Sequence, residues 1–325
     1  MPLVRALPVP WGMGLLIEGK WHDRWYETKK GRFVRDQTVF RDRIAAAEPN
    51  RYHLYVSYAC PWASRTLIFR KLKKLEDVIG LSVVHPLMLE HGWTFEDCDG
   101  CTGDTVNGKK YLYEIYLLAK PDYTGRVTVP VLWDKKERTI VNNSSPEIIR
   151  ILNSEFNALS GESELDFYPE ALRPEIDEMN ELVYPNVNDG VYRCGFATTQ
   201  AAYEEAFDNL FNTLDQLEAR LARQRYLCGD RITEADWRLF TTLVRFDPVY
   251  HGHFKCNLRR LVDYPNLWGY TRDLYQVPGV AETVHLDHIK QHYYGSHKHI
   301  NPTGIVPKGP DIDYAMPHDR AQAWT

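Results

Sequence analysis

At residues 51–63 the chain reads Arg51-Tyr52-His53-Leu54-Tyr55-Val56-Ser57-Tyr58-Ala59-Cys60-Pro61-Trp62-Ala63. Side chains alternate from Tyr52 to Ser57 with the period of a half-buried β-strand. Pro61 suits the first turn of a helix, because the N–H that proline lacks would have no partner there. These residues therefore predict a strand, a short turn that ends at Cys60, and a helix.

A second β-rich run at residues 78–84 follows the helix, so the segment predicts a β-α-β unit with parallel strands. One face of the helix is apolar. The opposite face is basic, and we expect it to lie in solvent. Its members are Arg70, Lys71, Lys73 and Lys74.

The chain then leaves the sheet and returns to it. Residues 85–126 form an insertion with an apolar helical run at residues 112–118. Strands are predicted again at residues 127–133 and 139–141, and Ser145 is the expected N-cap of a helix with a proline in its first turn.

Pro130 stands inside the first of these strands, which requires a strand edge or a bulge. A cis bond before Pro130 would aim the backbone of Val129 at a peptide-like ligand, although such bonds are uncommon.

Helices dominate after about residue 160. A stripe of apolar side chains repeats at helical spacing and consists of Ala206, Leu210, Leu214, Leu217 and Leu221. Thr233 and Asp236 form a variant of the capping box. The chain from His297 onward is predicted to be a coil tail.

Residues 1–49 show no clear period. We expect an ordered coil that is held to the body by aromatic side chains. These are Trp11, Trp21, Trp25 and Tyr26.

The composition restricts the kinds of molecule that this protein can bind and the place where we expect it. The 325 residues include 39 basic and 44 acidic side chains, a net charge of −5, which argues against a protein that follows nucleic-acid phosphates. No apolar run is long enough to span a membrane, and the first residues lack the pattern of a secretory signal. We expect a cytoplasmic protein, and six cysteines are too few for a disulfide scaffold.

Cys60 is the candidate nucleophile. At the start of a helix, unpaired N–H groups and the helix dipole favour a thiolate, so we expect a lowered thiol pKa, helped by Arg65. The alternative is a buried structural cysteine. Ala63 stands where a second cysteine of a CxxC pair would be, so a resolving thiol has to come from outside, which points to a thiol co-substrate.

The chain resembles the glutathionyl-hydroquinone reductases, the xi class of the glutathione transferase superfamily, over nearly its whole length. The resemblance rests on segments spread along the sequence: 52–57, Ala59-Cys60-Pro61-Trp62, 85–88, Gly92-Trp93-Thr94-Phe95, 125–133, 195–198, 233–236, 245–250 and 301–304.

The resemblance implies an α/β plus all-α fold. A thioredoxin-like glutathione-binding domain would cover residues 50–155, and an all-helical domain with the coil tail would cover residues 156–325. The active site would lie in the cleft between them, and the protein would be a homodimer.

The implied reaction uses glutathione as co-substrate and no metal. The Cys60 thiolate would attack the sulfur of a glutathionyl-hydroquinone, release hydroquinone and form a mixed disulfide, which a second glutathione would resolve. The resemblance assigns glutathione to Trp93, Arg126, Val129, Ser144 and Ser145, and hydroquinone to Tyr192 and Tyr293. From the sequence alone, Trp93 and the tyrosines can equally be packing residues, and Arg126 a solvated loop charge.

One position departs from the family. Asn143-Ser144-Ser145-Pro146 stands where the family has Asn-Glu-Ser, so the carboxylate for the glutamyl ammonium is missing, a loss worth about 1.5–3 kcal/mol. Either Glu147 compensates or a different thiol is preferred.

Two further clusters are weaker candidates. Cys98 and Cys101 have the spacing of a zinc-ligand pair, but no second pair follows, so two free thiols or a disulfide are favoured. The histidines between His285 and His299 lack an acidic partner at fixed spacing, and metal binding is disfavoured. Two other functions remain alternatives: a transferase that conjugates glutathione to electrophiles, and a non-catalytic binding module.

Overall fold

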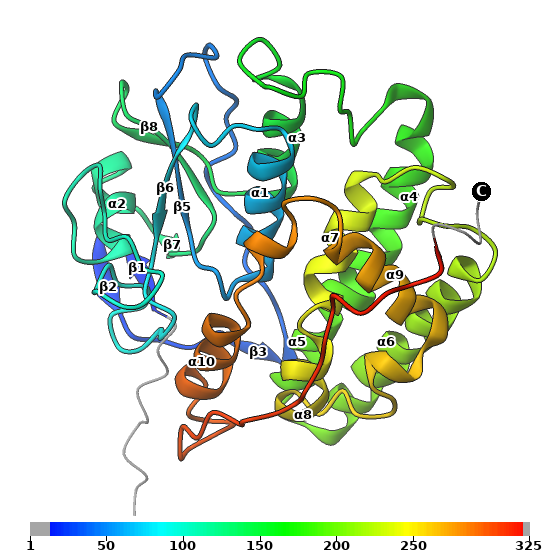
Figure 1. Cartoon of the computed structure of the whole chain (residues 1–325). Coiled ribbons are helices and arrows are strands. Elements are labelled where there is room, and N and C mark those ends of the chain that lie inside the picture. Colours follow the sequence, from blue (N-terminus) through cyan, green and yellow to red (C-terminus); the bar gives the residue numbers. More distant parts are fainter. Residues whose placement is uncertain (1–13, 321–325) are drawn as a thin grey trace, which may run out of the picture.

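The computed structural model describes residues 14–320. It has a sheet-containing part and a helical part that lie side by side (Figure 1). The expected fold class, an α/β part followed by helices, is confirmed. The domain boundaries at residues 49 and 155 stay predictions.

The central sheet has four strands in the order β6-β5-β8-β9. The strands are β5 (Tyr52–Val56), β6 (Gly80–Val83), β8 (Val131–Asp134) and β9 (Thr139–Asn142). β5 is parallel to β6 and antiparallel to β8, with Leu54 opposite both Leu81 and Leu132. The predicted β-α-β unit is therefore confirmed.

Helices cover both faces of this sheet (Figure 1). α1 (Pro61–Leu72) packs against α3 (Ser145–Ser154), and α2 (Leu112–Ala119), the expected helix of the insertion, packs against β9. One prediction for α1 is wrong: Lys73, directly after the helix, is fully buried, and its Nζ donates to the carbonyl of Leu165 at 2.7 Å.

The predicted strand at residues 127–133 is shorter than expected. Only Val131–Asp134 pairs in the central sheet, and the Val129–Pro130 bond before it is cis. Gly125–Arg126 (β7) instead joins a different sheet. The chain between these two strands leaves the ladder because a proline cannot donate to it.

Aromatic side chains hold the N-terminal segment to the body, as predicted, since Trp21 stacks on Tyr113 and Trp25 packs edge-on against Phe196, but the segment is not coil throughout. It forms four short strands: β1 (Leu15–Ile17), β2 (Lys20–His22), β3 (Thr28–Lys29) and β4 (Arg32–Phe33). β1 pairs with β2 and with β7, so this segment is attached to the insertion by backbone hydrogen bonds. Trp11 lies outside the described residues.

The second half is helical, as predicted. Its α-helices are α4 (Arg173–Val183), α5 (Gly190–Gly195), α6 (Gln200–Leu221), α7 (Glu234–Leu243), α8 (His251–His253), α9 (Pro265–Tyr275) and α10 (Leu286–Ser296). Short 3₁₀ turns lie at Glu170–Leu172, Leu261–Asp263 and Ala281–Thr283, and π-helical turns at Tyr184–Asn188 and Phe246–Tyr250.

Two local predictions for this half are confirmed. The apolar stripe of α6 is buried, and the helix begins at the N-cap Thr199, whose hydroxyl accepts from the N–H of Ala202 at 3.3 Å. Thr233 and Asp236 form the capping box at the start of α7. From His297 to residue 319 the chain has no helix or strand, in agreement with the expected coil tail.

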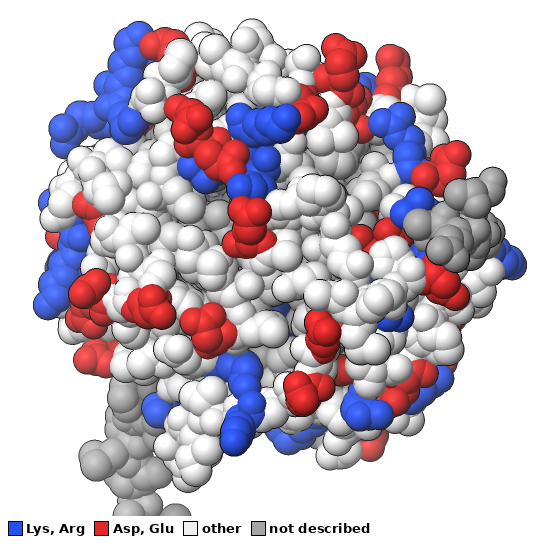
Figure 2. All heavy atoms as spheres, viewed as in Figure 1, with Lys and Arg blue, Asp and Glu red and all other residues white. Residues whose placement is uncertain are grey.

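Two connections fix the halves relative to each other. α7 packs against α1, and α10 returns to the sheet part, where the Ser296 hydroxyl accepts from the N–H of Met88 at 2.9 Å. Within residues 14–320, no helix combines the length and the apolar character that a membrane span needs. The face shown in Figure 2 carries acidic and basic side chains intermixed.

Candidate active site

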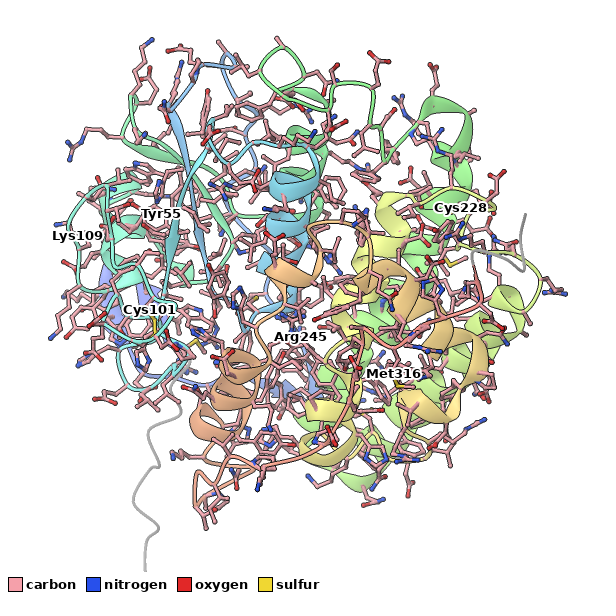
Figure 3. The ribbon with its side chains drawn as sticks, viewed as in Figure 1. Tyr55, Cys101, Lys109, Cys228, Arg245 and Met316 are labelled. Atoms are coloured by element: carbon pink, nitrogen blue, oxygen red, sulfur yellow. A yellow bond between two sulfur atoms is a disulfide. The ribbon has the colours of Figure 1, made fainter. Side chains whose placement is uncertain are left out.

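The turn that carries Cys60 is held by an arginine from the helical half. Arg245 Nε donates to the carbonyl of Ala59 at 3.0 Å, and its Nη2 donates to the carbonyl of Tyr58 at 3.1 Å and to Ser64 Oγ at 2.7 Å. Figure 3 shows Arg245 between the two halves. Arg245 therefore couples the position of Cys60, the N-cap of α1, to the helical part.

The Cys60 thiol is 8% exposed and donates to the carbonyl of Val129 at 3.7 Å. Burial raises the pKa of this thiol, although the N–H groups of Ala63 and Trp62 and the charges of Arg245 and Arg35 act in the opposite direction. The start of the helix therefore lowers the thiol pKa, as predicted, but burial raises it by more. The expected low pKa of Cys60 is wrong.

The charges of Arg65 and of the Cys60 thiolate interact, as expected, but the Arg65 guanidinium is also engaged elsewhere. Its guanidinium donates to Asn188 Oδ1 at 2.9 Å and to Ser145 Oγ at 3.4 Å. The charges of Arg245 and Arg35, which come from distant parts of the chain, also lower the pKa of Cys60.

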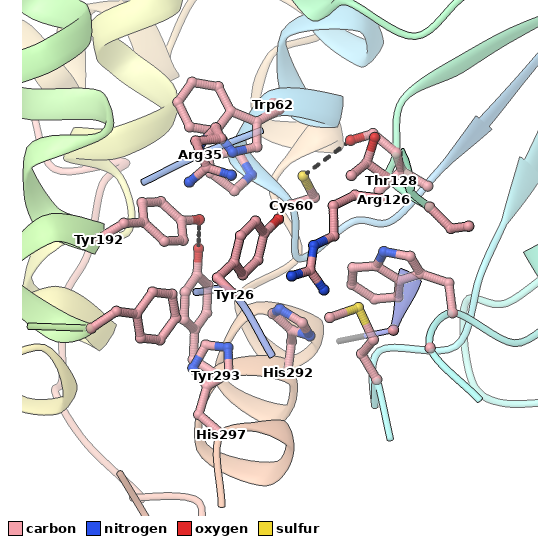
Figure 4. A pocket seen from close by; sticks show the side chains of 18 of the residues that line it. Tyr26, Arg35, Cys60, Trp62, Arg126, Thr128, Tyr192, His292, Tyr293 and His297 are labelled. Carbon is pink, nitrogen blue, oxygen red and sulfur yellow. Dashed lines mark hydrogen bonds between the residues drawn. The ribbon is translucent and has the colours of Figure 1, made fainter. Parts of the chain in front are cut away.

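Cys60 lies in one pocket (Figure 4), and a second pocket adjoins it. The first, here called the aromatic pocket, contains Cys60, Trp93, Tyr192 and Tyr293. The second, here called the polar pocket, contains Ser144 and Ser145. The two pockets share Tyr26, Arg35, Trp62, Arg126, Thr128 and Val129.

The predicted tyrosines belong to a chain of three hydroxyls. Tyr192 on α5 and Tyr293 on α10 have their hydroxyl oxygens 2.5 Å apart, and Tyr250 lies 2.9 Å from Tyr293. Burial raises the pKa of all three, that of Tyr250 to about 12, so they stay protonated donors at neutral pH. The sequence did not single out Tyr250, which was one aromatic residue among many.

Trp93 both lines the aromatic pocket and packs against a neighbouring side chain. Its side chain is 6% exposed and stacks on the ring of His292 with centroids 4.8 Å apart. His292 is fixed in turn by a hydrogen bond of 2.9 Å between Nδ1 and the carbonyl of Pro86.

Arg126 is not a solvated loop charge, since its side chain is 9% exposed. Its guanidinium donates to the carbonyls of Arg24 and Trp25, bonds to Asp36 at 3.2 Å, and lies 4.0 Å from the ring centre of Tyr26. All four partners belong to the N-terminal segment. Arg126 thus closes one wall of both pockets by holding that segment in place.

Ser144, not Ser145, is the N-cap of α3, one residue earlier than predicted. Both serines line the polar pocket, but Glu147 does not. Its carboxylate bonds to Arg41 and, at 2.9 Å, to Asn142 Nδ2. Among the described residues of the polar pocket, Asp36 supplies the only carboxylate.

The N-terminal segment contributes site residues that the sequence did not reveal. Tyr26, Arg35 and Asp36 line the pockets, yet they lie in a stretch without periodicity. No local pattern marks them, because distant residues hold them: Asp189 holds Arg35, and Arg126 contacts both Tyr26 and Asp36.

The weaker candidates do not form metal sites within residues 14–320. Cys98 and Cys101 form a disulfide, one of the two expected states. His288 bonds to the carbonyl of Asp99 at 2.7 Å, and His297 bonds to His253 at 3.1 Å.

Comparison with known proteins gives the same family in both halves. Residues 59–155 match the glutathione S-transferase N-terminal domain, and residues 200–273 match the glutathione S-transferase C-terminal domain. The chain is 56% identical over 324 residues to the glutathionyl-hydroquinone reductase YqjG of Escherichia coli K12, covering 95% of this chain and 98% of that protein. It is 58% identical over 306 residues to the glutathionyl-hydroquinone reductase PcpF of Sphingobium chlorophenolicum, covering 92% and 96%.

Solved structures agree. A xi-class glutathione transferase of Natrialba magadii matches with a TM-score of 0.92 at 50% identity, covering 96% of this chain and 98% of that one. The glutathione-bound structure of YqjG matches with a TM-score of 0.87 at 55% identity, covering 96% and 100%. The chain therefore belongs to the xi class of glutathione transferases, the family of the glutathionyl-hydroquinone reductases.

Proposed function

We propose that this protein reduces glutathionyl-hydroquinones to hydroquinones at the expense of glutathione, with Cys60 as nucleophile. The observation that carries the proposal is the position of the Cys60 thiol, which lies in the aromatic pocket and contacts the carbonyl of Val129, a residue that the polar pocket shares. A thioether between a peptide-like thiol and an aromatic ring would then have its sulfur next to Cys60.

In the first step the Cys60 thiolate attacks the glutathionyl sulfur. A sulfur–sulfur bond forms, the carbon–sulfur bond breaks, and its electron pair passes to the ring. The ring accepts this pair as a phenolate when it is first in its keto tautomer, in which a proton has moved from a hydroxyl oxygen to the carbon that bears sulfur. The phenolate then takes up a proton, and hydroquinone leaves.

In the second step a glutathione thiolate attacks the mixed disulfide at the glutathione sulfur. Oxidised glutathione leaves, and the Cys60 thiolate is restored. The other reduced cysteines of the described chain support an external thiol, because Cys194, Cys228 and Cys256 are buried and line neither pocket.

The polar pocket suits the zwitterionic end of glutathione. Ser144 and Ser145 offer hydroxyls and the start of α3 to the glutamyl carboxylate. We assign the glutamyl ammonium to Asp36, since this carboxylate lines the polar pocket and that of Glu147 does not. The backbone of Val129, before the cis bond, pairs with the cysteinyl part of glutathione, and Trp93 and Arg126 close the site around it.

The aromatic pocket suits the hydroquinone. Tyr192 and Tyr293 present protonated hydroxyls, which donate to ring oxygens and supply the proton that the phenolate takes up. The rings of Trp62 and Phe196 line the same pocket and provide apolar contact.

Purified protein mixed with a glutathionyl-hydroquinone and excess glutathione tests the proposal by chromatography of the products. We expect one hydroquinone and one oxidised glutathione per turnover, and none from Cys60→Ala. Conjugation of glutathione to an electrophile without release of hydroquinone would favour the transferase alternative. Binding without turnover would favour the binding module.

We also propose that the protein acts as a homodimer in the cytoplasm. Each turnover consumes reduced glutathione, which is maintained there. Sedimentation equilibrium tests the oligomeric state, and cell fractionation tests the location.

A further inference from the structure

Arg35 has a buried hydrogen-bond donor that faces no acceptor. The residue follows β4 and lines both pockets. Its Nε donates to Asp189 Oδ1 at 2.8 Å, which fixes the guanidinium, but Nη2 is buried and has no hydrogen-bond partner among the described residues. A buried unpaired N–H costs free energy unless a ligand satisfies it.

The surroundings of Arg35 are aromatic. The guanidinium carbon lies 5.2 Å from the ring centre of Phe33, 5.0 Å from that of Trp62 and 4.8 Å from that of Tyr192. Burial opposes the charge of Arg35, but Asp189 and the neighbouring tyrosines raise its pKa above the usual value, so the group stays cationic. Rings at these distances fix a cation beside a flat ligand.

Arg35 also lies on the side of the cavity that faces the nucleophile. Figure 4 shows its guanidinium between Trp62 and Tyr192, across from Cys60. The other arginine shared by both pockets, Arg126, already donates to Arg24, Trp25 and Asp36. Arg35 is therefore the better placed of the two to bind a group of the substrate.

We propose that Arg35 is a catalytic residue whose Nη2–H donates to the hydroquinone oxygen on which negative charge develops as the carbon–sulfur bond breaks. This inference rests on the reductase function proposed above. When the Cys60 thiolate attacks sulfur in the keto tautomer, the electron pair of the carbon–sulfur bond becomes the lone pair of a phenolate oxygen. A fixed cation at that oxygen stabilises the transition state more than the neutral substrate.

The test compares Arg35→Met with a matched control, Arg32→Met. Arg32 belongs to the same segment, is ion-paired with Glu205 and lines neither pocket. kcat/KM is measured for a series of ring-substituted glutathionyl-hydroquinones whose hydroxyl pKa is lowered by chlorine or raised by methyl groups.

We expect Arg35→Met to lose about 100-fold in kcat/KM with the methylated, least acidic hydroquinones, the scale found for a lost oxyanion donor. The loss should shrink steadily as chlorine makes the leaving phenol more acidic, because a more acidic phenol forms a phenolate that is stabilised less by a hydrogen-bond donor. Arg35→Lys should restore part of the rate, and Arg32→Met should follow the wild type. An equal loss across the whole series would overturn the inference and reduce Arg35 to a residue that shapes the pocket.

A second readout needs no turnover. 4-Nitrophenol bound in the aromatic pocket should ionise at lower pH than in solution, seen as absorbance near the nitrophenolate band, in the wild type and Arg32→Met but not in Arg35→Met. Thermal unfolding shows whether Arg35→Met is folded, and Arg35→Lys serves if it is not. A wild-type protein that releases no hydroquinone overturns the proposed function and this inference with it, whereas normal release with an unchanged nitrophenol pKa overturns the inference alone.

Discussion

At the scale of single residues, the structure shows how far a sequence motif determines chemistry. Cys60 opens α1 as predicted, and the N–H groups of Trp62 and Ala63 lower its pKa as a helix start should. The net pKa is nevertheless raised, because the sulfur is buried. The nucleophile is therefore placed by its motif and tuned by its surroundings.

The raised pKa of Cys60 predicts the pH dependence of its alkylation. Only the thiolate reacts, so the rate of modification by iodoacetamide should still be rising at pH 9, where an ordinary thiol is levelling off. Mass spectrometry of quenched samples measures the rate at Cys60, with Cys60→Ala to identify the peptide. A rate that is constant above pH 7 would show a thiolate at neutral pH and contradict this prediction.

The position of Asp36 in the polar pocket predicts that its substitution weakens the binding of glutathione through the glutamyl ammonium. Asp36→Asn should raise the KM for glutathione about two- to fivefold, the scale of one partly exposed ion pair. N-acetylated glutathione, which has no ammonium, should show no such change. Asp42→Asn is the matched control, since Asp42 is exposed on the same segment and does not line the polar pocket.

Equal effects of Asp36→Asn on both thiols would mean that Asp36 acts through Arg126, with which it is paired, and would remove it from the proposed ammonium site.

At the scale of elements, the sequence correctly predicts the start of α7, but it does not predict that Lys73, at the end of α1, is buried. The capping box of α7 depends on residues three positions apart, so the sequence predicts it. Lys73 was expected in solvent, but the chain near Leu165 covers it and accepts its hydrogen bond. No pattern within α1 signals a contact with a segment about 90 residues away.

Replacing Asp236 at the start of α7 should destabilise the protein strongly. The Asp236 carboxylate accepts from the N–H of Leu227 at 2.9 Å, from the N–H of Thr233 at 2.7 Å and from the Tyr270 hydroxyl at 2.8 Å, and it is fully buried. The Thr233 hydroxyl also donates to it, at 2.9 Å. Asp236→Ala leaves these four buried donors without their acceptor, so we expect a loss of about 2–5 kcal/mol in the free energy of unfolding.

Urea denaturation measures this loss. Asp263→Ala is the control, because Asp263 also caps a helical turn but is exposed at the surface, and it should cost about 1 kcal/mol or less. Equal losses for the two variants would contradict the role assigned to burial at Asp236.

At the scale of the whole molecule, the two halves meet at a cluster of buried aromatic and imidazole rings. His253 stacks on His297, and His292 stacks on Trp93 from the sheet part. Burial lowers the pKa of His253 to about 3 and that of His292 to about 4, and holds the pKa of His297 well below its usual value. These rings are neutral in the folded protein.

The neutral histidines predict a loss of stability in mild acid. In the unfolded chain each takes up a proton near pH 6.5, so the unfolded state binds more protons and stability is present above that pH and falls below it. For His292 the loss is complete near pH 4 and is on the order of 3 kcal/mol. We expect Tm to fall steadily between pH 6.5 and pH 5, above the range where most carboxylates titrate.

Calorimetry across this pH range measures the slope. His22→Gln, a change at an exposed histidine outside the cluster, should leave the slope unchanged. A Tm that does not vary between pH 7 and pH 5 would mean that the cluster is protonated in the folded state.

The sequence by itself determined the parts of this protein that neighbouring residues control. The strand, turn and helix around Cys60, the apolar stripe of α6 and the capping box at Thr233 depend on residues only a few positions apart. Their backbone hydrogen bonds and side-chain periods are local, so a local pattern predicts them.

Only the tertiary structure decided how the site is completed. The wall formed by Arg35 and Asp36 requires Asp189 and Arg126 to come close to it, and the hydroxyl chain of Tyr192, Tyr250 and Tyr293 requires three helical elements to converge. The raised pKa of Cys60 follows from the same convergence, because burial is a property of everything that surrounds a sulfur atom. Contacts between distant segments have no signature in any one segment. Local pattern therefore predicts the nucleophile, the family resemblance points to Trp93, Tyr192 and Tyr293 beside it, and the N-terminal wall appears only in the fold.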